Sequence, residues 1–341
     1  MQKLRLVLPI LLLAAAIGIA VFLLPGKKNE IVKEEFFAMD TVMDISLYPT
    51  KDTDEKPDVI MAELRDRIYE MERELSVTKP DSDVGRLNKA SGNGEWIPVS
   101  EDAWELISEA VAVSSETKVD GCATFDPTLY PIVRLWGFTT GTNRVPGGDE
   151  IKKELEKVGF GNIELGSDPN KREVRLAKGA EMDLGACAKG FLSDALCEIM
   201  KKHKVNGIVS LGGNVQSVGT KDDGEAFSVG IVDPKDGQTL TEVIRQDRDQ
   251  AVVTSGNYER YFEKDGKRYH HIMDERTGAP ADSGLASVTV VGPRGVLCDA
   301  YATALFVMGE EKANEFLKSH TDYHAAFIYE DGYKKGFEIQ K

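Results

Sequence analysis

The sequence predicts an α+β protein with mixed or mostly antiparallel sheets and flanking helices, preceded by one N-terminal apolar anchor helix. In the second half of the chain, short strand patterns follow one another without a helix after each, which argues against a doubly wound parallel sheet. Helical apolar stripes occur both early and late in the chain. An uncharged apolar run of 19 residues, at 6–24, stands apart from everything after it.

The apolar run at 6–24 has basic residues on both sides. At 1.5 Å per residue such a helix spans about 28 Å, close to the hydrocarbon thickness of a bilayer. A cleaved signal usually has a shorter core and a small-x-small cleavage site, which residues 23–26 lack. We expect residues 1–28 to be an uncleaved anchor in the cell inner (cytoplasmic) membrane, with a cleaved signal segment as the alternative. Either way, residues 29–341 lie on the extracytoplasmic or periplasmic side.

The composition of the whole sequence excludes several classes of protein. The 341 residues include 57 acidic and 42 basic ones, for a net charge of −15, and 41% are hydrophobic. This excludes a disordered chain and a protein that spans the membrane many times. The acidic balance argues against nucleic acid, because binding phosphates needs clustered Lys and Arg. We expect residues 29–341 to form one large domain, or one domain of two lobes.

The first expected elements are a strand and a long helix. Residues 36–48 alternate as a strand, with Met43, Ile45 and Leu47 on one face. Pro57 stands near the start of a helix. Its apolar stripe has helical spacing and consists of Ile60, Leu64, Ile68, Met71 and Leu75.

The next segments alternate between loops and helices. Residues 76–94 are polar and rich in turn-forming residues, so we expect a loop. Ser100 suits a helix N-cap, and a helix follows it. Residues 141–148 read as a loop, and residues 150–158 as a short charged helix.

The second half is predicted to be mainly strands. They lie around 173–176, 207–211, 227–232, 251–254, 286–291 and 325–329. The helices interrupting them are at 188–202, 297–308 and 310–319. The four cysteines form no C-x-x-C pair, so neither a zinc site nor a redox dithiol is indicated, and a disulfide between two of them stays open.

Glycine-rich turns mark two candidate binding segments. Residues 182–190 read Met-Asp-Leu-Gly-Ala-Cys-Ala-Lys-Gly and join a strand to a helix. A helix N-terminus with free N–H groups and a Lys can bind a phosphate, although the spacing is neither that of a P-loop nor that of a dinucleotide fold. Residues 211–214, Leu-Gly-Gly-Asn, end a buried strand. Each could equally be a tight turn without a ligand.

Two further segments carry groups suited to catalysis. His270 and His271 are adjacent on a strand and point to opposite faces, so one could be a general base, or one could lie in the core and the other on the surface. Asp299 and Thr303 are one turn apart in an apolar helix. A buried Asp needs a partner or a cation, and carboxylate and hydroxyl oxygens suit Mg²⁺, while an N-cap role for Asp299 is the alternative.

Taken in chain order, these segments resemble one family. The set comprises Met39-Asp-Thr41, Pro80-Asp-Ser82, Phe125-Asp-Pro-Thr128, Leu135-Trp-Gly-Phe138, Asp183–Gly190, Leu211-Gly-Gly-Asn214, Thr254-Ser-Gly256, Tyr258-Glu-Arg260, His271-Ile272, Arg276-Thr-Gly278 and Asp299–Thr303. It is similar to the FAD:protein FMN transferases of the ApbE type, once described as thiamine biosynthesis lipoproteins. The resemblance runs from about Phe36 to the C-terminus and implies an ApbE-like, T-fold-like architecture.

The resemblance implies an activity and a partner. Members of this family transfer FMN from FAD to a Thr or Ser hydroxyl of an acceptor protein, with Mg²⁺, and release AMP. The acceptor motif resembles Asp-x-x-Thr/Ser-Gly-Ala-Thr/Ser, and plausible acceptors are membrane-associated redox subunits. The alternatives are an FAD pyrophosphatase, which forms FMN and AMP, and a flavin-binding protein without chemistry.

The resemblance also implies residue roles. The metal ligands are Asp299, Thr303 and the backbone carbonyl of Ala186, and the catalytic base is His271. The residues implied to contact FAD are Met39, Thr78, Thr124, Phe125, Asp126, Asp183, Lys189 and Ile272. The sequence departs from the family pattern at two of these places. Asp40 follows Met39 where members usually have Gly, and Thr78 stands where an aromatic residue often stacks on FAD.

Overall fold

The computed structural model describes residues 31–168, 170–246 and 249–337. The expected anchor at 6–24 lies outside these ranges. None of the helices within them combines the length and hydropathy that a bilayer crossing requires.

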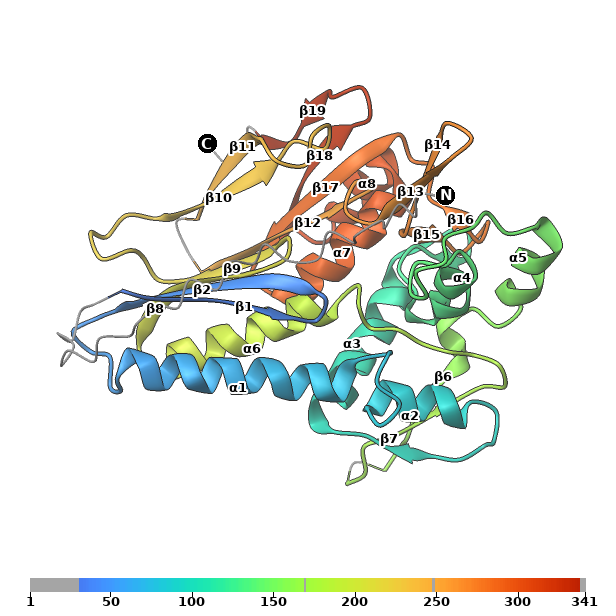
Figure 1. Ribbon diagram of the computed structural model, residues 1–341, viewed down its shortest axis with the longest axis horizontal. Coiled ribbons are helices and arrows are strands. Elements are labelled where there is room, and N and C mark those ends of the chain that lie inside the picture. Colours follow the sequence, from blue (N-terminus) through green and yellow to red (C-terminus); the bar gives the residue numbers. More distant parts are fainter. Residues whose placement is uncertain (1–30, 169, 247–248, 338–341) are drawn as a thin grey trace, which may run out of the picture.

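An antiparallel sheet of eight strands organises the fold, in the order β1-β2-β8-β9-β12-β17-β18-β19 (Figure 1). Its strands are β1 (Val32–Ala38), β2 (Thr41–Pro49), β8 (Val205–Leu211), β9 (Asn214–Val218), β12 (Gln250–Gly256), β17 (Leu285–Gly292), β18 (His324–Tyr329) and β19 (Lys334–Lys335). Every strand pairing within the described ranges is antiparallel. The predicted α+β class with antiparallel sheets is therefore confirmed.

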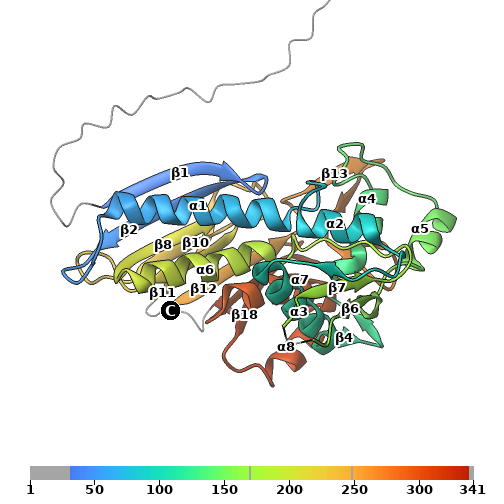
Figure 2. The same cartoon turned by 90° about the horizontal axis from the view of Figure 1, so that it is seen from below.

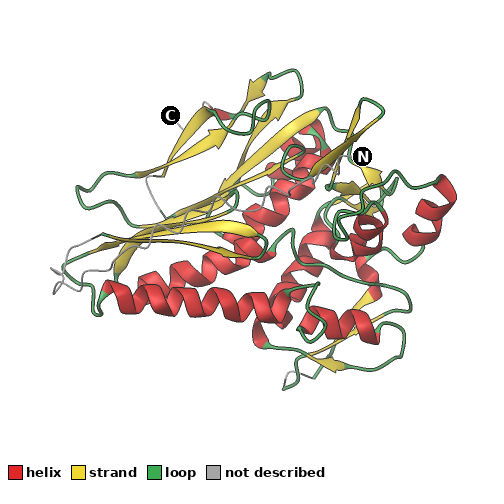
Figure 3. Ribbon diagram, in the orientation of Figure 1, coloured by secondary structure: helices red, strands yellow, loops and turns green. Residues whose placement is uncertain are grey.

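Three helices cover one face of this sheet: α1 (Pro57–Leu75), α6 (Ala188–Lys202) and α7 (Gly295–Met308) (Figure 3). The α1 and α6 helices run side by side beneath β1, β2 and β8 (Figure 2). Alternate strand residues such as Met43, Val209 and Val253 point into this helical layer and are fully buried. The layer holds most of the hydrophobic core.

A hairpin covers part of the opposite face of the sheet. It is formed by β10 (Phe227–Val232) and β11 (Leu240–Gln246). Its Val229 and Ile231 pack against Val252 and Val291, which alternate with the residues that face the helices. The central strands are therefore buried on both faces, as their nearly continuous apolar sequence predicts.

The smaller elements gather at the end of the sheet to which α1 and α7 point (Figure 1). The helices are α2 (Asp83–Ala90), α3 (Glu101–Glu116), α4 (Tyr130–Leu135), α5 (Gly148–Leu155) and α8 (Glu310–Leu317). The strands are β3 (Ile97–Pro98), β4 (Lys118–Val119), β5 (Cys122–Ala123), β6 (Ile163–Leu165), β7 (Glu173–Leu176), β13 (Tyr261–Lys264), β14 (Lys267–His270), β15 (Met273–Asp274) and β16 (Ala279–Pro280). All four cysteines are free thiols.

The single strand predicted at 36–48 is wrong, because this segment is the hairpin β1–β2. Its tight turn consists of Met39 and Asp40, with φ of +48° and +59°. Two residues at positive φ are typical of the hairpin turn that usually carries Asn-Gly. Because Met-Asp does not have the sequence of such a turn, the alternating pattern of 36–48 gave no sign that the chain reverses direction there.

The loop predicted at 76–94 is also partly wrong, because it contains α2. Ser82 caps this helix by accepting a hydrogen bond from the N–H of Gly85 at 2.9 Å. Only Val84 and Leu87 are buried apolar residues of α2. Two apolar positions one turn apart are too few to give a helical period in the sequence.

Candidate functional site

A cavity of about 830 Å³ lies where the end of α1, the start of α6 and the middle of α7 meet the sheet and the β10 strand. Residues from many distant segments line it. Among them are all twelve site residues predicted from the sequence: Met39, Thr78, Thr124, Phe125, Asp126, Asp183, Ala186, Lys189, His271, Ile272, Asp299 and Thr303. The fold therefore brings the twelve predicted residues to one cavity, and their individual roles remain predictions.

Asp299 and Thr303 lie on α7 and supply two oxygen donors to the cavity. The Asp299 carboxyl group is 5% exposed, and its Oδ2 accepts a hydrogen bond from the N–H of Gly190 at 2.9 Å. Burial raises the pKa of Asp299, while the Lys189 ammonium group opposes this shift. The Thr303 hydroxyl lies 3.3 Å from the hydroxyl of Ser255. An N-cap role for Asp299 is excluded, because α7 begins at Gly295.

The side chain of Asn214 is the strongest sign that this part of the cavity is built for a bound group. Asn214 is completely buried, lines the cavity, and lies close enough to Asp299 to lower the pKa of that carboxyl group. Its Nδ2 is directed at the Asp299 carboxyl group, whereas its Oδ1 has no hydrogen-bond partner among the described residues. Because an unpaired buried amide oxygen is costly, a bound group that pairs with it would be stabilising.

The oxygen atoms that line the same cavity as Asn214 are suitable ligands for a hard cation such as Mg²⁺. They are a carboxylate, a hydroxyl and the backbone carbonyl of Ala186, which lies on the exposed turn just before α6. No group of three His, Cys, Asp or Glu side chains within the described ranges is placed to hold a metal ion. A mixed set of few protein oxygens suits Mg²⁺, which keeps several waters and takes phosphate oxygens as further ligands.

Asp183 and Lys189 flank the start of α6. The Asp183 Oδ1 accepts the N–H of Gly185 at 2.9 Å, which closes the turn before the helix. Burial raises the pKa of Asp183, and the positive charges of Arg260 and Lys189 oppose this shift. No side chain caps the N-terminus of α6. The N–H groups of Ala188 and Gly190 already donate to the Leu184 carbonyl and to Asp299, so a phosphate group here would meet the Lys189 ammonium group and the positive end of the helix.

His271 and His270 point in opposite directions, as predicted. His271 lines the cavity, and its Nδ1 lies 3.3 Å from the carbonyl oxygen of Arg260. We assign the proton to Nδ1, which leaves the lone pair on Nε2. Burial, reinforced by the Arg260 charge, lowers the pKa of His271 to about 3, so the ring is neutral near pH 7.

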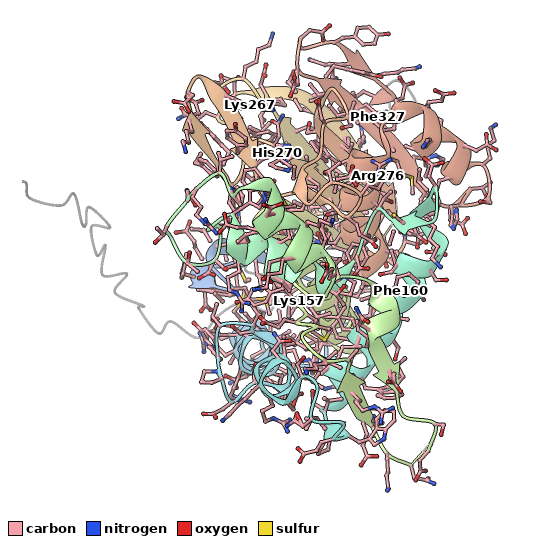
Figure 4. All side chains as sticks on the ribbon, turned by 90° about the vertical axis from the view of Figure 1, so that its right-hand side faces the viewer. Lys157, Phe160, Lys267, His270, Arg276 and Phe327 are labelled. Atoms are coloured by element: carbon pink, nitrogen blue, oxygen red, sulfur yellow. The ribbon has the colours of Figure 1, made fainter. Side chains whose placement is uncertain are left out.

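His270 belongs to the core. It is 6% exposed, its Nε2 lies 3.1 Å from the carbonyl oxygen of Ala281, and its ring meets Phe306 edge-on. In Figure 4, His270 lies deeper in the molecule than Lys267 of the same strand. Of the two histidines, only His271 can meet a ligand in the cavity.

The turn formed by Thr124, Phe125 and Asp126 uses its polar groups within the protein. The carboxylate of Asp126 accepts hydrogen bonds from the backbone N–H and the hydroxyl of Thr128 and, at 2.6 Å, from the N–H of Phe160. The hydroxyl of Thr124 donates to the carbonyl of Thr117 at 2.8 Å. This segment can therefore meet a ligand mainly through its backbone and the side of the Phe125 ring.

The rim of the cavity includes the turn at Met39 and Asp40 and the segment after α1. Thr78 lies there, with its hydroxyl 3.0 Å from that of Ser76. Apolar and aromatic side chains, among them Tyr130, Phe138 and Ile272, form the adjoining wall. The cavity thus combines a charged centre with apolar walls, as a ligand with both phosphates and flat rings requires.

Comparison with known proteins agrees with this arrangement. The family model described as the ApbE family matches residues 39–328. The chain belongs to the ApbE family. The FAD:protein FMN transferase of Treponema pallidum is 35% identical over 277 residues, covering 77% of this chain and 75% of that protein. The protein of the same name from Klebsiella pneumoniae is 35% identical over 257 residues, covering 74% and 77%.

Solved structures of ApbE proteins share the fold. The ApbE protein of Thermotoga maritima superposes with a TM-score of 0.81 at 31% identity, covering 91% of this chain and 98% of that one. The flavin transferase ApbE of Vibrio cholerae gives a TM-score of 0.80 at 25% identity, covering 92% and 100%. The predicted family is therefore confirmed.

Sequence reasoning gave no role to three polar residues that line this ApbE cavity: Asn214, Glu259 and Arg260. Burial raises the pKa of Glu259 to about 7. The positive charge of Lys189 reduces this upward shift, and the negative charge of Asp299 adds to it. The segments that contain these residues were recognised as part of the family pattern. Their sequence gave no signal that Asn214 and Glu259 lie near Asp299, or that Arg260 lies near Asp183 and His271, because these proximities arise from the fold.

Proposed function

We propose that this protein transfers FMN from FAD to a Thr or Ser hydroxyl of an acceptor protein in an Mg²⁺-dependent reaction that releases AMP. The relatives named FAD:protein FMN transferase, which match about three quarters of the chain, support the reaction class. The observation that carries the proposal is the oxygen-lined pocket around Asp299, Thr303 and the unpaired Oδ1 of Asn214.

The protein's own groups divide the chemistry between binding and proton transfer. Asp299, Thr303 and the Ala186 carbonyl would hold Mg²⁺, which would neutralise charge that develops on the diphosphate. Lys189 and the N-terminus of α6 would bind the phosphates. The acceptor oxygen forms a bond to the FMN phosphorus, and the bond from that phosphorus to the AMP oxygen breaks.

The acceptor hydroxyl must lose its proton as the new bond forms, and Nε2 of His271 is our candidate to receive it. The neutral ring has its lone pair available without first losing a proton, because the pKa of His271 is lowered to about 3. Lys189 and Arg260 also lower this pKa, so His271 is a weak base that depends on close positioning.

We propose that residues 1–28 anchor the protein in the cytoplasmic membrane with the catalytic domain on the extracytoplasmic side. The basic residues that precede the apolar run, Lys3 and Arg5, support a cytoplasmic N-terminus and hence this orientation. The acceptor is then a membrane-associated or extracytoplasmic redox subunit that carries a motif such as Asp-x-x-Thr/Ser-Gly-Ala-Thr/Ser.

The test is to incubate the full-length protein with FAD, Mg²⁺ and a domain that carries the acceptor motif. Covalent flavin fluorescence of the acceptor in a denaturing gel is the expected result. Release of AMP without labelling would instead identify an FAD pyrophosphatase, and neither product would identify a flavin-binding protein. Repeating the reaction with cell envelope extract would show which native protein is labelled.

A further inference from the structure

The α7 helix, which carries Asp299 and Thr303, is capped by a residue of another helix. Its own N-cap residue, Arg294, makes no side-chain capping bond. Asp194 of α6 takes that place. Its Oδ1 accepts the N–H of Gly295 at 2.7 Å, and its Oδ2 accepts the N–H of Val296 at 3.0 Å. The negative charge of a carboxylate at the N-terminus of a helix also interacts favourably with the positive end of the helix dipole.

The two helices touch backbone to backbone at the same place. A Cβ atom on Gly190 of α6 would lie 2.2 Å from the carbonyl oxygen of Gly295, and one on Gly295 would lie 2.3 Å from the hydroxyl of Ser193. Both positions therefore require glycine. This close approach also lets the N–H of Gly190 reach Oδ2 of Asp299 at 2.9 Å.

Asp194 is itself held in place from the sheet. Nε2 of Gln216, on β9, donates to Oδ1 of Asp194 at 2.9 Å. Oε1 of Gln216 lies 2.6 Å from the hydroxyl of Ser193, and Gln216 is 5% exposed. The same strand begins with Asn214, whose side-chain amide lies beside the Asp299 carboxyl group and lowers its pKa. One chain of hydrogen bonds thus connects β9, α6 and α7.

We propose that Asp194 is a positioning residue that sets the geometry of the cation site through α7. It fixes the start of the helix at Gly295, the residue that Gly190 also touches, so that Oδ2 of Asp299 is held by Gly190 while the carboxyl group stays on the wall of the cavity. The inference rests on the proposed function, because it assumes that Asp299 binds Mg²⁺. Partners that orient a metal ligand typically alter metal affinity by about 10- to 100-fold when they are changed.

The test measures cation binding directly, without FAD or turnover. Mn²⁺, as a probe for Mg²⁺, is titrated into the full-length protein and free Mn²⁺ is followed by electron paramagnetic resonance. Asp194→Asn keeps the size of the side chain but places an amide N–H against one of the helix N–H groups. We expect it to weaken Mn²⁺ binding about tenfold.

Tyr301→Phe is the matched control on the same helix. The Tyr301 hydroxyl donates to Glu116 at 2.7 Å and does not line the cavity, so its loss should lower the melting temperature and leave Mn²⁺ affinity within about twofold. If Asp194→Asn also lowers the melting temperature but keeps wild-type affinity, Asp194 only caps a helix and the proposal fails.

A second variant guards against loss of folding in Asp194→Asn. Gln216→Ala leaves Asp194 in place but removes the amide that orients it, so we expect Mn²⁺ affinity to fall about threefold. Unchanged affinity in this variant would also overturn the proposal. If Asp299→Ala binds Mn²⁺ as tightly as the wild type, the metal assignment of the proposed function fails instead, which is a distinguishable result.

Discussion

Asp126 and Asp299 are both buried carboxyl groups on the wall of one cavity, yet the protein treats them differently. They are 7% and 5% exposed, and burial raises the pKa of each. Both oxygens of Asp126 accept hydrogen bonds from Thr128 and Phe160. Asp299 accepts a hydrogen bond from Gly190 through Oδ2, and the Asn214 amide beside it also lowers its pKa, while Oδ1 of that amide has no partner among the described residues.

The difference indicates that the Asp126 carboxylate has a structural role, whereas the Asp299 carboxylate is available to a ligand in the cavity. The donors around Asp126 belong to the protein, so its charge is compensated whether or not a substrate is present. The charge of Asp299 is compensated only in part, by Gly190, Asn214 and the Lys189 charge, so a cation bound in the cavity would complete the compensation. Burial and a raised pKa alone would have given the two residues the same role.

The largest expected effect is on activity in Asp299→Ala. The variant loses a charged oxygen ligand of the proposed cation site, so FMN transfer should fall at least about a hundredfold, as measured by the in-gel flavin assay. Its stability in urea should be equal to or above that of the wild type at pH 7, because an incompletely compensated buried charge is removed. If the variant is stable and retains full transfer, Asp299 is not required by a ligand, and the proposed difference between Asp299 and Asp126 is wrong.

His271→Asn tests the proposed general base. Its loss should lower the rate of transfer about 100-fold or more, with FAD binding retained. Because the pKa of His271 is lowered to about 3, His271 does not titrate near pH 6.5. The pH profile of kcat/KM near pH 6.5 should therefore have the same shape in the wild type and in the variant. An inflection near pH 6.5 that disappears in His271→Asn would contradict the neutral imidazole.

Asp126→Asn should act on stability. It replaces a carboxylate acceptor with an amide that places N–H groups against protein donors, so the free energy of unfolding should fall by about 2 kcal/mol in urea denaturation. Transfer by the folded fraction should change less than in Asp299→Ala. A variant of wild-type stability and no activity would place Asp126 with the ligand-binding residues.

The smallest effect concerns the rim of the cavity. Asp40 has a φ of +59°, which glycine adopts with less strain than other residues. Asp40→Gly should therefore raise the free energy of unfolding, by no more than about 1 kcal/mol. If the variant is less stable, a contact of the Asp40 side chain contributes more than the backbone strain removes.

Much of the fold followed from local sequence patterns. The helix at 188–202 and the strands at 173–176 and 227–232 have the predicted bounds, because their periodicity and end signals agree. The hairpin turn at Met39 and Asp40 was missed because its residues are unusual for positive φ. The α2 helix was missed because it buries few apolar side chains.

The site was recognised through motifs rather than geometry. Motifs located Asp299, Thr303, Lys189 and His271 in the sequence, and all four line the cavity. The capping role of Asp194 could not be read from its sequence, because the N–H groups that it accepts from lie 101 and 102 residues away. Such long-range hydrogen bonds have no local signature.

The most direct test of the cation site is anomalous diffraction from crystals of the protein grown with FAD and Mn²⁺. We expect an anomalous peak within bonding distance of Oδ1 of Asp299, the Thr303 hydroxyl and the Ala186 carbonyl, bridging to the diphosphate. A diphosphate bound in the cavity with no peak beside Asp299 would contradict the account.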